Sequence, residues 1–325
     1  MEVLRTEVAR DGLSALPLEV YVPEDGGPFP VVVFSHGAGG SGDCCKPLVE
    51  RWASHGYVVV APTHDDSVKL RMSESSGRGR AREARRLLID AVRMVAAPEG
   101  RERRVADVKT LLDALPVLME RHEELRGKLD VESIGMSGHS AGALTGQLIA
   151  GVKSFVDGEA LELGDARPDA FVLLSPQGIS EGVGFTEDSW RDLGGPTLFV
   201  TGSEDAGIGG QDPEWRKQGY ERAPAGDKYL LFIEGAAHSS FTGTALERPN
   251  RRMGSRMGRR GGQGNPMGRA LRAGSGDTKK IVAWTATTAL AFWDAYLKDD
   301  TEARSFLASD AMMQASEGDA VLSGK

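Results

Sequence analysis

Short, almost continuously apolar segments recur along the chain, separated by longer stretches with an amphipathic pattern. Residues 30–35 and 57–62 are the clearest apolar runs, and each has the length of a single strand. Strands that are apolar at nearly every position are typical of a mainly parallel sheet covered on both faces. The same pattern predicts further strands at residues 18–23, 131–136, 170–175, 197–202 and 228–233.

Helices are predicted between these strands, where apolar residues recur every three or four positions. They cover about residues 45–55, 81–96, 101–126, 141–152 and 280–297. The regular order of strand and helix predicts an α/β fold, a doubly wound, mainly parallel sheet with helices on both faces. Because we find no internal repeat and no separate second pattern, we expect a single domain over residues 1–325, with a helical insertion at about 66–130.

One short motif follows a predicted strand and opens a predicted helix. Residues 138–142 read GHSAG and fit the pattern G-x-S-x-G. A strand, a sharp turn and a helix are the context of a nucleophile elbow, whose turn exposes the serine hydroxyl. Glycines suit this turn because they leave room where the backbone packs closely. The context favours Ser140 as a nucleophile over the alternative, an incidental serine in a glycine-rich turn.

A glycine-rich segment directly follows the predicted strand at 30–35, where residues 36–40 read HGAGG. An enzyme that transfers acyl groups must hold the developing oxyanion with preorganised backbone N–H groups. In folds with a nucleophile elbow, one N–H belongs to the residue after the nucleophile, here Ala141, and the other to a loop after an earlier strand. By position, we predict Ala38 as the second donor. A tight turn between strand and helix is the alternative interpretation, and the two are compatible.

An acid and a base are expected later in the chain. Asp205 follows the predicted strand at 197–202, and its neighbour Glu204 is the competing candidate. His238 follows a later predicted strand and is the only histidine after both the serine and the acid. The chain order serine, acid, histidine is the one that accompanies a nucleophile elbow. We therefore predict Ser140, Asp205 and His238 as the catalytic residues.

Two further histidines are candidates for contact with substrate. His139 precedes Ser140, and we expect its side chain to point away from the nucleophile and to pack or shape the pocket wall. His64 begins a run with Asp65 and Asp66 that could suggest a metal site. Adjacent ligands on one loop, without a third cluster, make a poor site. We therefore expect no metal, and we assign His64 to the pocket lining or to the turn.

The composition is ordinary for a globular protein, with 40% hydrophobic and 26% charged residues among 325. The N-terminus has neither the basic nor the apolar region of a signal peptide, and the apolar runs are too short to span a bilayer. The only two cysteines, Cys44 and Cys45, are adjacent and would pair poorly. We therefore expect a cytoplasmic protein without disulfides and without a membrane partner.

Charge is distributed unevenly along the chain. Residues 247–280 carry eight Arg and two Lys against two acidic residues, a local net of +8, which leaves −16 for the rest of a chain whose net charge is −8. An acidic body with one basic segment is not typical of a nucleic-acid-binding domain, so we expect no nucleic-acid partner. The glycine-rich composition of this segment predicts a flexible loop. Its position soon after His238 also allows a cationic rim that concentrates anionic substrates.

Taken together, these motifs resemble those of the dienelactone-hydrolase-like esterases of the α/β-hydrolase fold, near platelet-activating-factor acetylhydrolase and the bacterial polyester hydrolases. The resemblance covers about residues 30–297 and rests on residues 34–40, 53–62, 104–108, 138–142, 202–205, 235–238 and 291–297. It implies an ester hydrolase without a cofactor, with Ser140, Asp205 and His238 as its triad. True dienelactone hydrolases use a cysteine nucleophile, so the resemblance does not extend to that specific activity.

The sequence thus predicts a serine hydrolase that cleaves small or polymeric carboxylic esters through an acyl-serine intermediate. Two alternatives stay open. A peptidase or amidase could use the same triad, because a fold does not fix its chemistry. A non-catalytic binding protein could also retain the fold. The patterns specify no oligomeric state.

Overall fold

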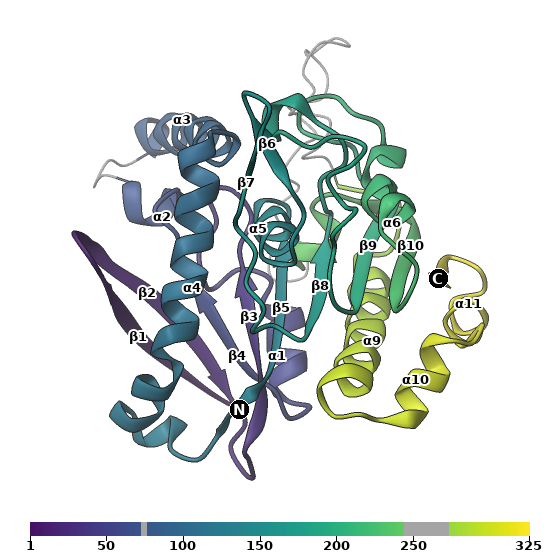
Figure 1. Ribbon diagram of the computed structural model, residues 1–325, viewed down its shortest axis with the longest axis horizontal. Coiled ribbons are helices and arrows are strands. Elements are labelled where there is room, and N and C mark those ends of the chain that lie inside the picture. Colours follow the sequence, from purple (N-terminus) through teal and green to yellow (C-terminus); the bar gives the residue numbers. More distant parts are fainter. Residues whose placement is uncertain (73–76, 244–272) are drawn as a thin grey trace.

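A nine-stranded sheet forms the centre of the described part of the chain (Figure 1). The computed structural model describes residues 1–72, 77–243 and 273–325. The strand order across the sheet is β1-β2-β4-β3-β5-β8-β9-β10-β11. The bounds are β1 Glu2–Arg10, β2 Leu13–Val22, β3 Phe29–Ser35, β4 Val58–Pro62, β5 Leu129–His139, β8 Ala170–Leu174, β9 Thr197–Glu204, β10 Lys228–Ala237 and β11 Ala320–Gly324.

The middle of this sheet is parallel. Strands β4, β3, β5, β8, β9 and β10 pair in parallel in that order. At one edge β2 joins β4 and β1 joins β2 antiparallel, and at the other edge β11 joins β10 antiparallel. The predicted mainly parallel sheet is therefore confirmed, and each predicted strand lies in it. The carboxyl ends of the parallel strands meet at one edge, where ligands bind in such sheets.

The two outermost strands were not predicted. In β1 only Val8 and Arg10 are buried, and in β11 only Ala320 is. Their remaining positions are exposed or half-buried, so neither strand contains the apolar run that marks a strand covered on both faces.

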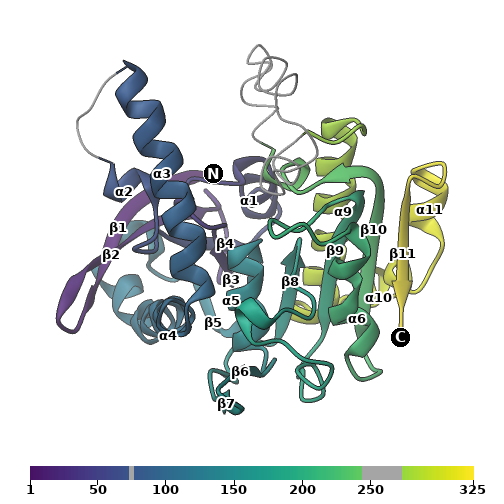
Figure 2. The same ribbon diagram turned by 90° about the horizontal axis from the view of Figure 1, so that it is seen from above.

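Helices cover both faces of the sheet, as predicted. Figure 2 shows α1 and α9 on one face and α4, α5 and α6 on the other, and α3 packs against α4. The bounds are α1 Lys46–Ala53, α2 Val68–Arg71, α3 Gly77–Ala96, α4 Pro98–Arg121, α5 Ala141–Ile149, α6 Gln218–Arg222, α9 Thr278–Leu297, α10 Thr301–Leu307 and α11 Ala311–Ala315.

Two separate hydrophobic cores result, because successive side chains of a strand point to opposite faces. In β3, Val31 and Val33 belong to the core beneath α4 and α5. Val32 and Phe34, the residues between and after them, belong to the core beneath α1 and α9. The second core contains the edge-on ring pair of Trp52 and Trp293. A strand buried on both faces requires the continuous apolar run seen in the sequence.

The smaller elements complete the connections. The region predicted as an insertion, about 66–130, contains α2, α3, α4 and the 3₁₀ helix η1. A two-stranded hairpin follows α5. The bounds are β6 Ser154–Val156, β7 Glu159–Leu161, η1 Glu123–Leu125, η2 Glu181–Val183, η3 Pro213–Lys217 and η4 Ser240–Thr242.

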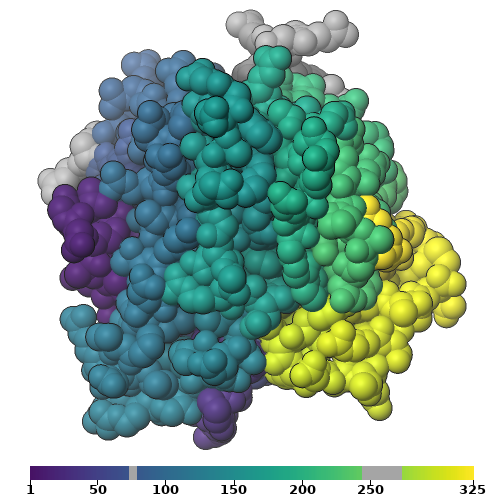
Figure 3. All heavy atoms as spheres, viewed as in Figure 1, coloured from purple at the N-terminus to yellow at the C-terminus, as the bar shows by residue number. Residues whose placement is uncertain are grey.

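The C-terminal elements extend one side of the molecule. The predicted helix at 280–297 is α9, which Asp277 begins by accepting a hydrogen bond from the Lys279 N–H. After it, α10 packs against α9, and α11 packs against β11, which pairs with β10. The space-filling view shows these C-terminal residues in yellow along one side of the molecule (Figure 3). Of the basic stretch 247–280, residues 247–272 lie outside the described residues. No helix in the described ranges is both long and apolar enough to cross a membrane.

Candidate active site

Ser140 lies in a sharp turn between β5 and α5, as the motif predicted. Its backbone has φ 56° and ψ −111°, a conformation that residues with a side chain rarely adopt. Such strain persists only where the surroundings enforce it, and it is concentrated at functional sites. Here the enforcement is close packing: a Cβ at Gly142 would lie 1.8 Å from the Ser35 carbonyl oxygen, and one at Gly138 would lie 2.7 Å from it.

Ser140, His238 and Asp205 form a continuous hydrogen-bonded series. The Ser140 Oγ lies 2.9 Å from His238 Nε2, and His238 Nδ1 lies 2.9 Å from Asp205 Oδ1. These residues come from the ends of β5, β10 and β9, so the parallel sheet brings together positions far apart in sequence. All three are nearly inaccessible to solvent. The structure thus places the three predicted residues in the order that proton transfer from the serine hydroxyl requires.

Asp205, and not Glu204, contacts the histidine. The Asp205 carboxylate is fully buried, and its second oxygen accepts a hydrogen bond of 2.9 Å from Thr201 Oγ1. Burial alone would raise the pKa of this carboxyl, but Arg216 and His238 outweigh burial and hold the pKa well below its ordinary range. Asp205 is therefore ionised at neutral pH. Glu204 is exposed and accepts a hydrogen bond from the Ser275 N–H instead.

Arg216 is a buried member of this site that sequence reasoning missed. Its Nε donates to Asp205 Oδ1 at 3.1 Å, and its Nη2 lies 3.1 Å from His238 Nδ1. Its Nη1 donates to the carbonyl oxygens of Ser175 and Pro176, each at 2.9 Å. Burial, followed by the charge of Arg216, lowers the pKa of His238, and Asp205 opposes both effects. No motif marks Arg216, because an arginine in a polar stretch usually reads as a surface residue.

Ala38 and Ala141 lie on the two segments that meet at Ser140. A Cβ at Gly37 would lie 3.6 Å from Ser140 Cβ, so the 36–40 loop passes directly beside the nucleophile. Ala141 is the first residue of α5, where backbone N–H groups have no partner within the helix. Within the described residues, neither the Ala38 nor the Ala141 N–H donates a hydrogen bond to another residue. Both N–H groups therefore remain available to an oxyanion.

His139 packs, but toward the site and not away from it. Its ring centroid lies 4.8 Å from that of His238, and its Nε2 lies 2.9 Å from the His238 carbonyl oxygen. Burial and the neighbouring His238 lower the pKa of His139 to about 3. The expectation that this side chain points away was wrong, because the ring fills the space between the elbow and the His238 loop. His139 therefore contacts His238 as a neutral donor.

His64 lies in a buried polar network. Its Nδ1 is 2.8 Å from Asp107 Oδ2 and its Nε2 is 2.9 Å from Ser35 Oγ, so both ring nitrogens have partners. Asp107 in turn accepts a hydrogen bond from Arg10. Burial and Arg104 lower the pKa of His64.

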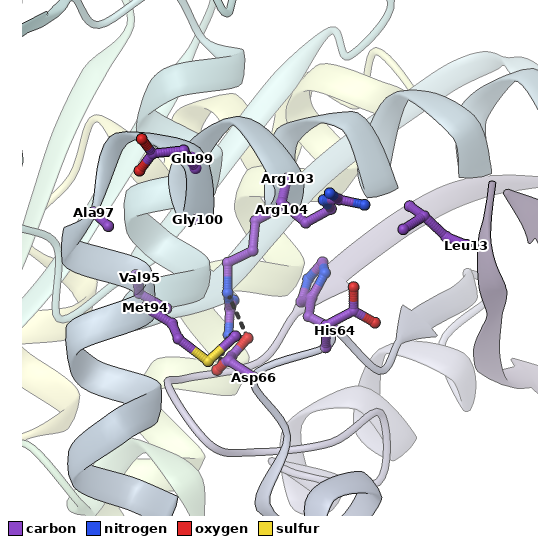
Figure 4. A pocket seen from close by; sticks show the side chains of 11 residues that line it. Leu13, His64, Asp66, Met94, Val95, Ala97, Glu99, Gly100, Arg103 and Arg104 are labelled. Atoms are coloured by element: carbon purple, nitrogen blue, oxygen red, sulfur yellow. Dashed lines mark hydrogen bonds and ion pairs between the residues drawn. The ribbon is translucent and has the colours of Figure 1, made fainter. Parts of the chain in front are cut away.

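His64 also lines a cavity of about 340 Å³ together with residues of α3 and α4 (Figure 4). None of Ser140, Asp205 and His238 lines this cavity. Of the two alternatives for His64, its contacts favour the turn: its carbonyl oxygen accepts from the Ser67 N–H, and its own N–H donates to His36 Nε2. In the described residues, no group of three or more His, Cys, Asp or Glu side chains could hold a metal ion.

Comparisons with known proteins agree with this architecture. A family model described as Chlorophyllase matches residues 2–75. The chain is similar to Cutinase est2 of Thermobifida alba, with 26% identity over 222 residues, which cover 67% of this chain and 56% of that protein. It is also similar to Cutinase est1 of the same organism, with 25% identity over 183 residues, 56% of this chain and 44% of that protein. The chain thus matches about half the length of these relatives.

A solved structure extends the likeness over nearly the whole chain. The ferulic acid esterase from Streptomyces cinnamoneus superposes with a TM-score of 0.64 at 18% identity, covering 98% of this chain and 94% of that chain. At this identity the likeness concerns the fold. Together with the strand order, it shows the predicted α/β-hydrolase fold, and the matches as a group confirm the resemblance to esterases of this kind.

Proposed function

We propose that the protein is a serine esterase that hydrolyses carboxylic esters through an acyl-serine intermediate. The observation that carries this proposal is the series from Ser140 Oγ through His238 to the buried, ionised Asp205. The strained turn at Ser140 and the two available N–H groups beside it support the same conclusion. A binding protein would have no need of this combination, since strain and buried charge both cost stability.

In the first half of the reaction, His238 Nε2 takes the Ser140 hydroxyl proton as Oγ attacks the ester carbonyl carbon. Asp205 accepts the Nδ1 hydrogen bond, which orients the ring and stabilises the imidazolium. The carbonyl oxygen becomes an oxyanion, and the N–H groups of Ala38 and Ala141 donate to it. When the tetrahedral intermediate collapses, the bond to the alcohol oxygen breaks and His238 returns its proton to that leaving group.

In the second half, water attacks the acyl-serine and His238 takes a proton from it. The intermediate collapses again, Ser140 Oγ regains its proton from His238, and the carboxylic acid leaves. The steps use only protein groups, the ester and water.

The names of the relatives point to the same reaction class. Two matched proteins are cutinases and the solved neighbour is a ferulic acid esterase. Ester hydrolysis is the chemistry that these names share. We therefore propose a small or polymeric carboxylic ester as the substrate.

The first prediction tests this function directly. Ser140→Ala and His238→Ala should each lower ester hydrolysis on the order of 10³-fold or more, because the residues of such a series act as a unit. The measurement is a panel of nitrophenyl esters of increasing acyl length, run beside the matching anilides. Ester turnover without anilide turnover separates an esterase from an amidase or peptidase.

Ser137→Ala is the matched control. Ser137 lies in β5, three residues before Ser140, is also buried, and donates its hydroxyl hydrogen bond to the Val172 carbonyl oxygen. This variant should keep wild-type turnover. A fluorophosphonate probe that labels wild type but not Ser140→Ala identifies the nucleophile. A Ser140→Ala protein with a tenth of wild-type activity contradicts the proposal.

A further inference from the structure

The loop of residues 36–40 is fixed at both ends by two side chains from distant parts of the chain. Arg104 Nη1, from α4, donates to the His36 carbonyl oxygen at 2.8 Å. Asp66 Oδ2, from the segment after β4, accepts a hydrogen bond of 2.8 Å from the Gly39 N–H. These two contacts lie on either side of Ala38.

Arg104 and Asp66 also hold each other. The Nε and Nη2 groups of Arg104 donate to the two carboxylate oxygens of Asp66, at 3.0 Å and 2.9 Å. Both side chains are almost fully buried. Burial raises the pKa of Asp66, but Arg104 outweighs it and lowers the pKa below the ordinary range, so the pair is ionised. A buried ion pair of this kind contributes little net stability to a fold, because the loss of hydration of both charges offsets their attraction.

The guanidinium geometry explains why this position holds an arginine. One edge of the planar guanidinium, formed by Nε and Nη2, binds Asp66 with two parallel hydrogen bonds, and Nη1 still reaches the His36 carbonyl oxygen. A lysine ammonium carries the same charge but cannot make both contacts in a fixed plane.

Part of the space around the pair is open and not packed. Arg104, Asp66 and His64 line the cavity of about 340 Å³ together with Met94 and Val95 of α3 (Figure 4). No residue of the 36–40 loop lines this cavity. The loop itself packs closely at Gly39, where an added Cβ would lie 3.0 Å from Leu88 Cδ1 and 3.1 Å from Val68 Cγ2. Apolar contacts therefore restrict the space that the loop can occupy, whereas Arg104 and Asp66 make the directional contacts to its backbone at His36 and Gly39.

We propose that Arg104 and Asp66 are positioning residues that hold the 36–40 loop, and with it the Ala38 N–H, in the geometry needed to bind the oxyanion. This inference rests on the proposed function. Oxyanion stabilisation depends on donors that are already aligned, and a displacement of about 1 Å far from the reacting atoms can cost on the order of 100-fold in rate. The pair acts through the loop and contacts no substrate.

The test is Arg104→Lys, compared with Arg101→Lys. Arg101 lies one turn earlier on the same helix, is similarly buried, and bonds to the Ala96 carbonyl oxygen and not to the loop. Arg104→Lys should lower kcat about 10- to 100-fold while KM changes less than about threefold, because the lost interaction acts in the transition state. Affinity for an alkylboronic acid, which forms a tetrahedral adduct, should fall by a similar factor. Arg101→Lys should leave all three values near wild type.

A second measurement does not depend on activity. Hydrogen exchange of the Gly39 amide should be at least about tenfold faster in Arg104→Lys than in wild type, and unchanged in Arg101→Lys. If Arg104→Lys does not fold, Asp66→Asn removes the charge with little change of shape and should show the same two effects.

The outcomes separate the two proposals. A folded Arg104→Lys protein with the kcat and the Gly39 exchange of Arg101→Lys overturns the positioning role. If the Ser140→Ala variant hydrolyses esters as wild type does, the proposed function is overturned. The exchange measurement on Arg104→Lys still decides whether Arg104 holds the loop.

Discussion

At the scale of single residues, the most unusual group of the site is Asp205, whose Oδ1 accepts hydrogen bonds from both His238 and Arg216. When His238 takes the serine proton, it becomes a cation that contacts both the Asp205 carboxylate and the Arg216 guanidinium. Asp205 favours that charge, whereas Arg216 and burial oppose it. The net effect lowers the pKa of His238, so the ring stays neutral and able to accept a proton under mildly acidic conditions.

This balance predicts the pH dependence of a variant. Arg216→Met removes a cation that lowers the pKa of His238 and leaves Asp205, which raises it. The His238 pKa should therefore rise, and the acidic limb of kcat/KM should move to higher pH, since that limb reports the essential base of the free enzyme. The measurement is kcat/KM for a neutral ester across pH.

Arg216→Lys serves as the conservative variant for this prediction. It keeps a positive charge near the pair, so its acidic limb should lie between those of wild type and Arg216→Met. If kcat/KM of Arg216→Met were lower at every pH but its acidic limb lay at the wild-type pH, Arg216 would act on the structure of the site and not on the pKa of His238.

Residue-scale reasoning from sequence reached Ser140, Asp205 and His238 because each follows a recognisable strand and the chain order limits the choices. The same reasoning could not reach Arg216. Its contacts depend on how η3 folds back against the ends of β8 and β9, and nothing near it in sequence records that approach. The same reasoning left His64 between the pocket lining and the turn, because its partner Asp107 is on a helix 43 residues away.

At the scale of elements, the site depends on how closely α5 approaches the end of β3. The first turn of α5 passes so near β3 that Gly142 has no room for a side chain: an added Cβ would lie 1.8 Å from the Ser35 oxygen and 2.5 Å from the Ser35 carbonyl carbon. These are backbone atoms of a central strand and cannot move aside. The approach also brings the Ala141 N–H to the 36–40 loop.

Gly142→Ala should therefore lower the free energy of unfolding by more than about 4 kcal/mol or prevent folding, a loss typical of a severe backbone clash. Gly79→Ala, the same change inside α3, is the control, because an added Cβ there meets nothing within 4 Å. It should raise stability by up to about 1 kcal/mol, since alanine favours helix. Urea denaturation measures both. A Gly142→Ala protein as stable as wild type would contradict the close packing.

Elements were predictable in proportion to their burial. The inner strands β3, β4 and β8 are buried at nearly every position and read as apolar runs. In the edge strands β1 and β11 most positions are exposed or half-buried, so their sequences contain no such run. Edge strands need only one covered face, so their sequences are constrained less strongly.

At the scale of the whole molecule, four histidines are buried around the carboxyl end of the sheet: His36, His64, His139 and His238. Burial is the largest influence on each of them and lowers each pKa, and neighbouring cations or histidines lower it further. As neutral rings, these side chains donate or accept the hydrogen bonds that connect the loops of the site. Protonation of these histidines therefore affects both the hydrogen bonds of the site and the free energy of unfolding of the whole molecule.

The last prediction follows from that link. Unfolded histidines bind a proton as pH falls through about 6.5, whereas the folded histidines stay neutral to lower pH. The unfolded state then holds more protons, so stability must fall as pH falls from 7 to 5. For each histidine that remains neutral in the folded state, the slope steepens toward about 1.4 kcal/mol per pH unit once the pH is well below the unfolded pKa of about 6.5. His139, whose pKa is about 3 beside His238, Asp205 and Arg216, should remain neutral throughout this range.

The variant His139→Gln keeps an N–H donor for the His238 carbonyl oxygen but cannot titrate. Its free energy of unfolding should therefore fall less steeply as the pH falls, and the difference in slope should equal the contribution of one histidine. The Ser137→Ala variant, which changes a buried residue but removes no titratable group, should keep the wild-type slope. Denaturant unfolding at several pH values between 7 and 5 measures all three slopes, and parallel curves for wild type and His139→Gln would mean that His139 is not held neutral by its burial at the site.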